Sequence, residues 1–378
     1  MSTCDGRHAR PPHRHDCPRG PRQSEPRCSL ASLGARHRRC HNPALSRNVL
    51  RYVARIGRCR APGRHGPRNS TLVHYAGRML IDAHVHAVDF LQQPASAGEL
   101  LRGMDAAGVD RAVLFGLPVK KKWPSNEPRR PHYYLDGNSP CYYFSLTDEI
   151  IASLAAELPR DRFAATLCGF DPTDQVAVDH IQLVWERHDC WRGLGEIMLR
   201  HDDLTNLTHG ENPSAAHPAL DSVFAFAADQ DCPVAVHHDS SSPGRPGEHE
   251  YVGQLDRMLT RHPGTTTIWC HAGVSRRVEP RRQHEVVEHL LDEHPRLHID
   301  VSWQLLDLVL SDDGTPSPEW TKLITRHPDR FVLGTDLLGR PENWSELTIP
   351  LRRLLDALPG PARDAVGAGN ALRLWWHE

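Results

Sequence analysis

The sequence MLIDAHVHAVDF, residues 79–90, is an apolar run that leads into two histidines and then into a loop. We interpret it as a β-strand, on which side chains two residues apart leave the same face about 7 Å apart. The imidazoles of His84 and His86 can therefore bind one metal ion, each with a bond of about 2.1 Å. Asp82 lies on the same face and could orient one of the histidines. Because the chain contains 26 histidines, this pair alone is weak evidence, and other strands must end in similar residues.

From Met79 onward, strand-like and helix-like segments alternate along the chain. We expect strands at about 79–86, 110–117, 162–170, 193–198, 233–237, 266–271, 297–301 and 330–336. We expect helices at about 97–107, 148–158, 172–188, 216–230, 250–262, 281–294, 317–327, 346–358 and 361–375. Eight alternating units predict an α/β fold in which a parallel sheet closes into a (β/α)8 barrel of the TIM type. The alternative is a doubly wound open sheet, which would need a Gly-rich turn after the first strand, and the sequence has none there.

Residues of metal-binding type gather where the predicted strands end, which is where barrels of this kind place their reacting groups. They are His84, His86, Glu196, His237, His271 and Asp336. Each has another explanation when taken alone: Glu196 as a solvated carboxylate, His271 as a hydrogen-bonded core residue, Asp336 as the cap of a turn. Their shared position at strand ends predicts a single metal centre.

These motifs resemble those of the amidohydrolase superfamily, and most of all the amidohydrolase-related branch that includes aminocarboxymuconate-semialdehyde decarboxylase and its hydrolase relatives. The resemblance covers about residues 79–378. It rests on DAHVH at 82–86, VH at 236–237, CHAG at 270–273, GTD at 334–336 and GNALRL at 369–374. Glu196 occupies a position where superfamily members place a carboxylated lysine, a glutamate or no ligand. The resemblance implies a divalent metal, with Zn²⁺ the leading candidate, bound as one or two ions.

The resemblance also implies roles for individual residues. His84, His86, His237 and Asp336 would hold the ion, and a water on it would have a pKa near 7. Asp336 would take the proton of this water and deliver it to the leaving group. His271 would polarise the substrate or act as a second acid or base, and in a two-metal site it would be a ligand.

A polar and aromatic insertion at about 118–146 follows the second predicted strand, so it begins on the face that carries the site. Long loops in compact domains are commonly functional. Its Lys121, Trp123 and Tyr134 suit an anionic, aromatic substrate, although a loop packed on its own aromatic residues would explain them equally well. Arg200, just after Glu196, is either a partner for a substrate carboxylate or a surface charge.

Residues 1–78 differ in composition from the rest of the chain. They hold 17 of the 45 basic residues and three acidic ones, so their net charge is near +14 and that of the remainder is near −16. Without apolar periodicity, such a segment cannot bury enough apolar surface to fold. It could be a basic arm for nucleic acid, a transit peptide, or an over-extended reading frame that precedes a start at Met79, and we favour the last. We therefore expect a disordered extension at 1–78 and one barrel domain at 79–378.

Composition also limits the partners and the compartment. The cysteines of residues 1–78 form no Cys-x-x-Cys pair, and several later ones lie in apolar runs, as reduced buried thiols do. The sequence has no secretory segment and no apolar run of 18 residues, so we expect a cytoplasmic protein without a membrane partner. The negative charge of residues 79–378 disfavours nucleic acid. We expect a small-molecule substrate, and a homo-oligomer is compatible with the sequence.

Four functions compete on this evidence. The leading prediction is a metal-dependent hydrolase that cleaves a C–N or C–O bond in a small, anionic amide, lactone or ester. A decarboxylase, which is a lyase, on the same scaffold is the nearest alternative. A TatD-like deoxyribonuclease shares the His-x-His pair, but a polyanion suits the negative charge poorly. A non-catalytic metal binder would not need Asp336 as a base.

Overall fold

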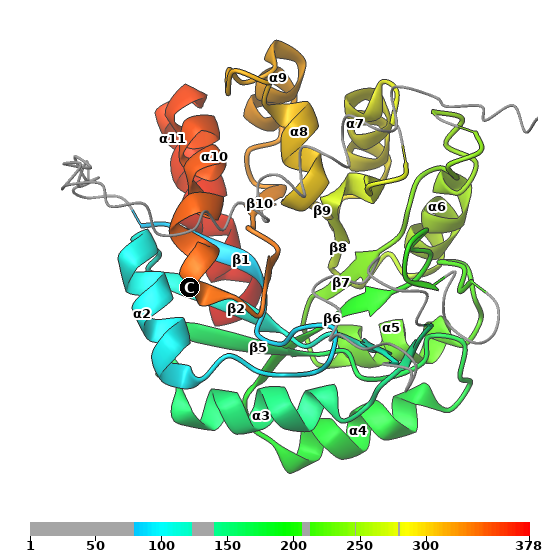
Figure 1. Cartoon of the computed structure of the whole chain (residues 1–378). Helices are drawn as coiled ribbons and strands as arrows, with labels where there is room; N and C mark the ends of the chain where they lie inside the picture. The colour runs from blue at the N-terminus through cyan, green and yellow to red at the C-terminus, as the bar shows by residue number, and fades with distance from the viewer. Residues whose placement is uncertain (1–78, 123–139, 206–211, 246, 279) are drawn as a thin grey trace, which may run out of the picture. The chain divides into compact units, whose positions relative to one another are not determined.

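The computed structural model describes residues 79–122, 140–205, 212–245, 247–278 and 280–378, which all lie in one compact unit, Arg47–Glu378. Its centre is a curled sheet of parallel strands with helices on the outside, the arrangement of an α/β barrel of the TIM type (Figure 1). The strand order is β10-β9-β8-β7-β6-β5-β2-β1-β11. Their bounds are β1 Ile81–His86, β2 Arg111–Phe115, β5 Phe163–Leu167, β6 Trp191–Met198, β7 Val234–His237, β8 Thr267–Cys270, β9 Leu297–Val301, β10 Phe331–Leu333 and β11 Leu337–Leu338.

The last strand closes the sheet. β10 pairs with β9, whereas β11, a few residues later on the same stretch of chain, pairs with β1. The backbone N–H of Asp336 donates to the carbonyl of His84 at 2.9 Å, and that of Gly339 donates to the carbonyl of His86 at 2.8 Å. The strand predicted at 330–336 is thus only β10, 331–333, and the segment that follows, 334–336, carries Asp336 against the end of β1 before β11 begins.

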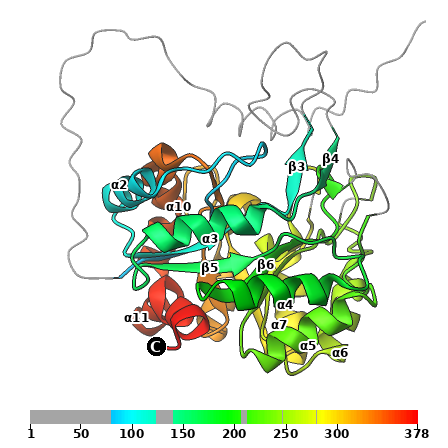
Figure 2. The ribbon, with the colours of Figure 1, turned by 90° about the horizontal axis from the view of Figure 1, so that it is seen from below.

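Helices cover the outer face of the sheet, as Figures 1 and 2 show. Leu100 and Met104 of α2 are fully buried, and Ser96 and Glu99 form a capping box at its start. Within the described residues, no helix is long and apolar enough to cross a membrane. The helices are α2 Ala97–Ala107, α3 Thr147–Glu157, α4 Ala177–Arg187, α5 Leu220–Asp229, α6 Val252–Arg261, α7 Gln283–Glu293, α8 Leu306–Val309, α9 Pro318–Arg326, α10 Trp344–Ala357 and α11 Gly360–Asp364.

Two helix predictions need correction. The helix expected from 172 begins at Ala177, because the carboxylates of Asp171 and Asp174 accept hydrogen bonds from the backbone of Thr173 and Val176 and form turns instead. The helix expected at 361–375 consists of α11 followed by two π-helical segments, 365–369 and 372–376.

The insertion predicted at 118–146 contains a two-stranded antiparallel sheet that the sequence analysis did not anticipate. It pairs β3, Val119–Lys121, with β4, Cys141–Tyr143. The Lys121 side chain is buried, with 1% exposed, so it is part of the packing around this sheet. Trp123 and Tyr134 lie outside the described residues, and their predicted contact with substrate stays a prediction.

The barrel interior is a separate, smaller core. Side chains from alternating strand positions fill it, among them Ile81, Phe115 and Val332, and Trp375 from the chain's end packs against them. Asn370 donates hydrogen bonds to the carbonyls of Pro328 and Phe331, where β10 begins. The C-terminal segment therefore covers the end of the barrel where strands begin, and the polar residues gather at the opposite end.

We expect the substitution Gly334→Ala to destabilise the protein where the barrel closes. A Cβ on Gly334 would overlap the Cβ of His84 and come within 3.0 Å of an oxygen of Asp300. Overpacking of this kind costs about 1–3 kcal/mol of unfolding free energy, which denaturant titration measures. Gly264→Ala is the control, because nothing lies within 4 Å of its added Cβ. Equal unfolding midpoints for the two variants would contradict the prediction.

Candidate metal centre

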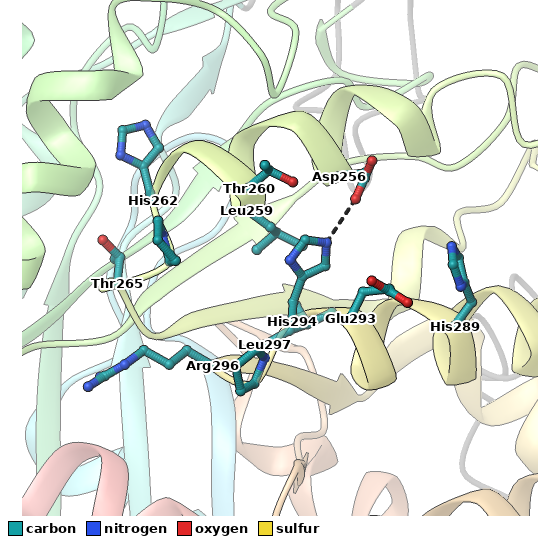
Figure 3. A pocket seen from close by; sticks show the side chains of 12 residues that line it. Asp256, Leu259, Thr260, His262, Thr265, His289, Glu293, His294, Arg296 and Leu297 are labelled. Carbon is teal, nitrogen blue, oxygen red and sulfur yellow. Dashed lines mark hydrogen bonds and ion pairs between the residues drawn. The ribbon is translucent and has the colours of Figure 1, made fainter.

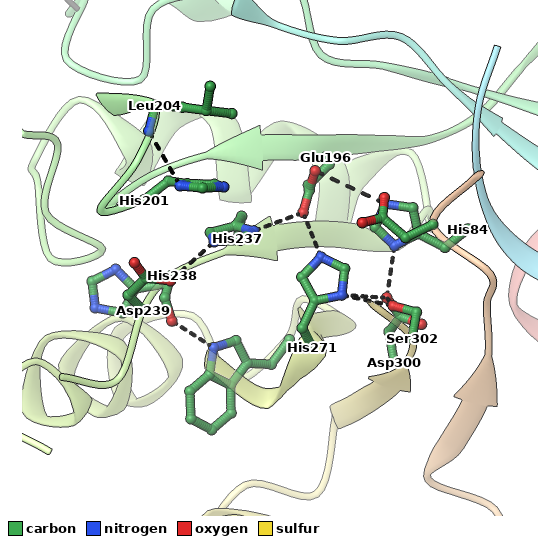
Figure 4. Close-up of polar contacts among 12 residues, drawn as sticks. His84, Glu196, His201, Leu204, His237, His238, Asp239, His271, Asp300 and Ser302 are labelled. Atoms are coloured by element: carbon green, nitrogen blue, oxygen red, sulfur yellow. Dashed lines mark hydrogen bonds and ion pairs between the residues drawn. The ribbon is translucent and has the colours of Figure 1, made fainter. Parts of the chain in front are cut away.

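Five of the predicted residues meet at the C-terminal end of the barrel. His84 and His86 come from β1, Glu196 comes from β6, His271 directly follows β8, and Asp336 lies three residues after the end of β10 (Figure 4 labels His84, Glu196 and His271). The Nε2 atoms of His84 and His86 lie 3.2 Å apart. Asp336 Oδ1 is 3.3 Å from Nε2 of His86 and 3.7 Å from that of His84. Glu196 Oε2 is 3.3 Å and 3.9 Å from the same two nitrogens.

Hydrogen bonds on the far side of each ring fix where the protons of these histidines lie. Nδ1 of His86 is 2.7 Å from the carbonyl oxygen of Gly116, which can only accept. Nδ1 of His84 is 2.7 Å from Oδ2 of Asp300, a carboxylate that also accepts. Both Nδ1 atoms therefore donate, and a neutral ring then has a bare lone pair at Nε2. Two such lone pairs facing each other at 3.2 Å call for a cation between them.

The spacing of these four atoms fits a metal ion. Four ligands at about 2.1 Å from a tetrahedral centre lie about 3.4 Å from one another. The five separations given above range from 3.2 to 3.9 Å. Two imidazole nitrogens and two carboxylate oxygens are also a donor set that Zn²⁺ accepts. The chemistry of these four residues therefore fits a divalent metal, and so does the spacing of His84, His86 and Asp336, which form one close group, while Glu196 groups with His84 and His271.

The pKa values in this cluster also show that the site stabilises positive charge. Burial disfavours the charged form of His86, but hydrogen bonds with Asp336 and Glu196 outweigh burial and raise its pKa to about 10. Burial would raise the pKa of Glu196, yet hydrogen bonds from His237, His271 and His86 hold it well below the usual range. The pKa of Asp336 is lowered too, against the effect of burial, by the hydrogen bond from His86. The carboxylates are thus ionised and attract cations.

His271 lies on the other side of Glu196. Its Nε2 is 3.4 Å from Glu196 Oε1, and its Nδ1 is 2.7 Å from Oγ of Ser302. Because the Ser302 hydroxyl donates to Asp300 at 2.6 Å, it accepts from Nδ1 of His271. In the neutral ring, His271 therefore also directs the Nε2 lone pair toward the cluster, and each oxygen of Glu196 faces a different pair of histidines.

His237 is held differently from the other predicted ligands. Its Nδ1 is 3.1 Å from Glu196 Oε1, and its Nε2 is 3.1 Å from Oδ1 of Asp239. His201 stacks on its ring with centroids 4.3 Å apart. Since both nitrogens of His237 face carboxylates, the structure brings it beside the cluster through Glu196, and its role as a ligand stays a prediction. His201, His237 and Asp239 also form a cluster of metal-binding type.

The predicted substrate-binding residues are more dispersed. The guanidinium carbon of Arg200 lies 3.6 Å from the centroid of the Tyr251 ring, a close cation–π contact. Lys121 is buried in the β3–β4 sheet. Contact of either residue with a substrate remains a prediction.

The sequence analysis missed Asp300 and Ser302. It also gave Asp82 a role, that of orienting a histidine ring, which the structure does not support. Asp82 does not orient an imidazole: its carboxylate accepts from the backbone N–H of His84 and Thr335, and from the indole of Trp344. It joins β1 to the end of β10, and burial raises its pKa to about 6. The signal that identified the other strand ends was present at Asp300 too, because an acidic residue stands at the end of the predicted strand 297–301.

A separate cleft of about 530 Å³ lies between α6 and α7 (Figure 3). Its lining includes Thr265 and Arg296, which precede β8 and β9, whereas the candidate site follows the strands. None of the predicted site residues lines it. The cleft is therefore at the opposite end of the barrel from the metal-binding residues.

Comparison with known families identifies the chain. The model of the family described as Amidohydrolase matches residues 176–376, slightly more than half of the chain. The chain belongs to this amidohydrolase family. This confirms the superfamily that its motifs resemble, and the branch within it stays a prediction. No curated protein matches this amidohydrolase.

Several solved structures are similar to this chain at low identity. An amidohydrolase from Burkholderia multivorans with bound zinc is 14% identical, covers 79% of this chain and 99% of its own, and has a TM-score of 0.49. A probable 2-pyrone-4,6-dicarboxylic acid hydrolase from Acinetobacter baumannii is 13% identical, with coverage of 79% and 99% and a TM-score of 0.48. A dihydroorotase from Campylobacter jejuni is 13% identical, with coverage of 79% and 83% and a TM-score of 0.48.

We expect Asp300→Asn to lower the affinity for Zn²⁺ about 10- to 100-fold. An amide that accepts from His84 through oxygen is a weaker orienting group than a carboxylate, and its N–H₂ face would favour the opposite tautomer. Competition with a chromogenic chelator measures the affinity. Asp148→Asn is the control: Asp148 is also buried, but its carboxylate accepts from the backbone of Cys168 and Gly169. Equal affinities for Zn²⁺ in the two variants would contradict the role given to Asp300.

Proposed function

We propose that this amidohydrolase is a metal-dependent hydrolase that cleaves a C–N or C–O bond of a small, anionic molecule. One observation carries the proposal: the Nε2 atoms of His84 and His86, which are bare when the rings are neutral, face each other at 3.2 Å, with the carboxylates of Glu196 and Asp336 beside them. A buried array of lone pairs is costly without a cation. Family membership supports the same conclusion, because amidohydrolases generally use a divalent metal.

In this proposal His84, His86, Glu196 and Asp336 hold the ion, and Zn²⁺ is the leading candidate. A divalent cation in such a site supplies Lewis acidity, which lowers the pKa of water toward about 7 and polarises a carbonyl oxygen. The protein's own contribution is to hold the ligands at fixed spacing through Gly116 and Asp300. His237 and Asp239 hold Glu196 from behind.

Asp336 is the residue best placed to move protons. Its side chain is 16% exposed, whereas those of His84, His86 and Glu196 are at most 3% exposed. It follows β10 at the open end of the barrel, so one oxygen can face the metal-binding nitrogens while the other faces an entering substrate. Asp336 takes a proton from the attacking water and passes it to the leaving nitrogen or oxygen. His271, whose Nδ1 is fixed by Ser302, orients or polarises the substrate from the next strand end.

The same residues would also serve a decarboxylase, so the reaction must be measured rather than assumed. We propose to assay the Zn²⁺-loaded protein on lactones, N-acyl amino acids, aryl esters and aromatic carboxylic acids. Release of a new carboxylate from the first three classes supports hydrolysis. Release of CO₂ from the acids, with no hydrolysis, would replace the proposal by the lyase alternative. Metal binding without turnover of any class would favour a non-catalytic binder.

We expect removal of the metal to abolish turnover and Zn²⁺ to restore it. The test is dialysis against a chelator, with metal content measured by mass spectrometry before each assay. At saturating Zn²⁺, Asp336→Asn is expected to lower kcat by about 10²–10⁴-fold, because the amide cannot accept the proton. The control is Asp89→Asn, because the Asp89 carboxylate accepts hydrogen bonds from the backbone N–H groups of Leu91 and Gln93. Full activity in verified metal-free protein would contradict the mechanism.

A further inference from the structure

Three neighbouring strands end in a left-handed backbone turn. His271 after β8 has φ 55°, Trp303 after β9 has φ 47°, and Asp336 after β10 has φ 53°. Residues other than glycine rarely adopt this conformation, and those that do cluster at functional sites. Two of the three are residues already assigned to the candidate site. Trp303 occupies the equivalent place between them, and the proposed mechanism gives it no role.

The Trp303 ring lies among the histidines of the site. Its centroid is 5.2 Å from that of His271, 5.9 Å from that of His201 and 6.2 Å from that of His237. Trp303 is half-buried and belongs to neither of the apolar cores formed by the described residues. The backbone strain at Trp303 thus places a large planar ring at the mouth of the site instead of in the packing between sheet and helices.

A buried cation accompanies this ring. The guanidinium carbon of Arg276 is 5.3 Å from the Trp303 centroid, within the range of a cation–π contact, and Arg276 is only 9% exposed. The next residue, Arg277, is about half exposed and pairs with Asp202 at 3.0 Å and Asp203 at 3.6 Å. The Trp303 ring thus lies 5.3 Å from the Arg276 guanidinium carbon and 5.2 Å from the His271 ring centroid, between a cation and the candidate site.

We propose that Trp303 and Arg276 form a substrate subsite that selects a planar, conjugated or aromatic carboxylate. A flat π-system stacks against the indole, and the carboxylate is attracted by the guanidinium. The cleavable bond then lies toward His271 and Asp336. This inference rests on the proposed function for the reaction, but it concerns binding and can be tested without turnover.

Calorimetry with two probes of equal charge tests the stacking contact. Benzoate is planar and cyclohexanecarboxylate is not, and any contribution from a metal–carboxylate bond is common to both. We expect the Zn²⁺-loaded full chain to prefer benzoate about tenfold. Trp303→Leu should remove the preference, whereas Trp303→Phe, which keeps a planar ring, should retain most of it. Trp185→Leu is the matched control, because Trp185 is also half-buried but packs against Phe226 outside the barrel.

The charged half of the subsite has its own test. Arg276→Gln is expected to weaken benzoate binding about tenfold and to leave benzamide binding unchanged. Arg257→Gln, an exposed position on α6, serves as the control. An unchanged benzoate preference in Trp303→Leu would overturn the subsite, and so would an equal loss for benzoate and benzamide in Arg276→Gln.

The outcomes separate this inference from the proposed function. Metal content is measured for every variant, and the titrations are repeated on metal-free protein. If the chain binds no metal but its benzoate preference depends on Trp303, the hydrolase proposal fails and the subsite stands. If metal and turnover are present but Trp303→Leu leaves the preference unchanged, the subsite alone fails.

Discussion

The candidate site depends on one buried oxygen, Oδ2 of Asp300. It accepts hydrogen bonds from Nδ1 of His84 at 2.7 Å and from the Ser302 hydroxyl at 2.6 Å, and Ser302 in turn accepts from Nδ1 of His271. One carboxylate therefore fixes the protons of two histidines on their outer nitrogens. Both then direct bare Nε2 atoms inward. Without this arrangement either ring could turn an N–H toward the cluster, and the lone pairs that suit a metal would be lost.

Closure of the barrel brings these residues together. The hydrogen bonds from the backbone of Asp336 and Gly339 to β1 join the two ends of the sheet, and the Asp82 carboxylate binds Thr335 and Trp344 across the same join. An open sheet would separate the first strand from the last by its full width. The site is thus a consequence of the topology. Residues about 250 positions apart in the sequence become neighbours only because β11 pairs with β1 and closes the barrel.

The sequence predicted the alternation of strands and helices well, because parallel strands buried on both faces read as apolar runs and helices as periodic ones. It also predicted that His84, His86, Glu196, His271 and Asp336 would gather at one end of the barrel, where the structure brings them together, since a polar residue at the end of an apolar run is conspicuous. It could not show which way a ring faces, so His237 was grouped with the others although its nitrogens point at Glu196 and Asp239. Trp303 escaped notice because its signal is a backbone dihedral angle rather than a residue type.

Charge decides what this arrangement can hold. Glu196, Asp336 and Asp300 bring three carboxyl groups into a largely buried space, where negative charge without a nearby positive charge is costly. Protons on the histidines can balance part of this negative charge, as the raised pKa values of His86 and His237, both about 10, indicate. A divalent cation is a better source, because it supplies two charges at the single point where the donor atoms converge. It also leaves the imidazoles neutral, with their protons on the Nδ1 atoms that bind Asp300 and Gly116. The hydrogen bonds and the metal therefore favour the same tautomers.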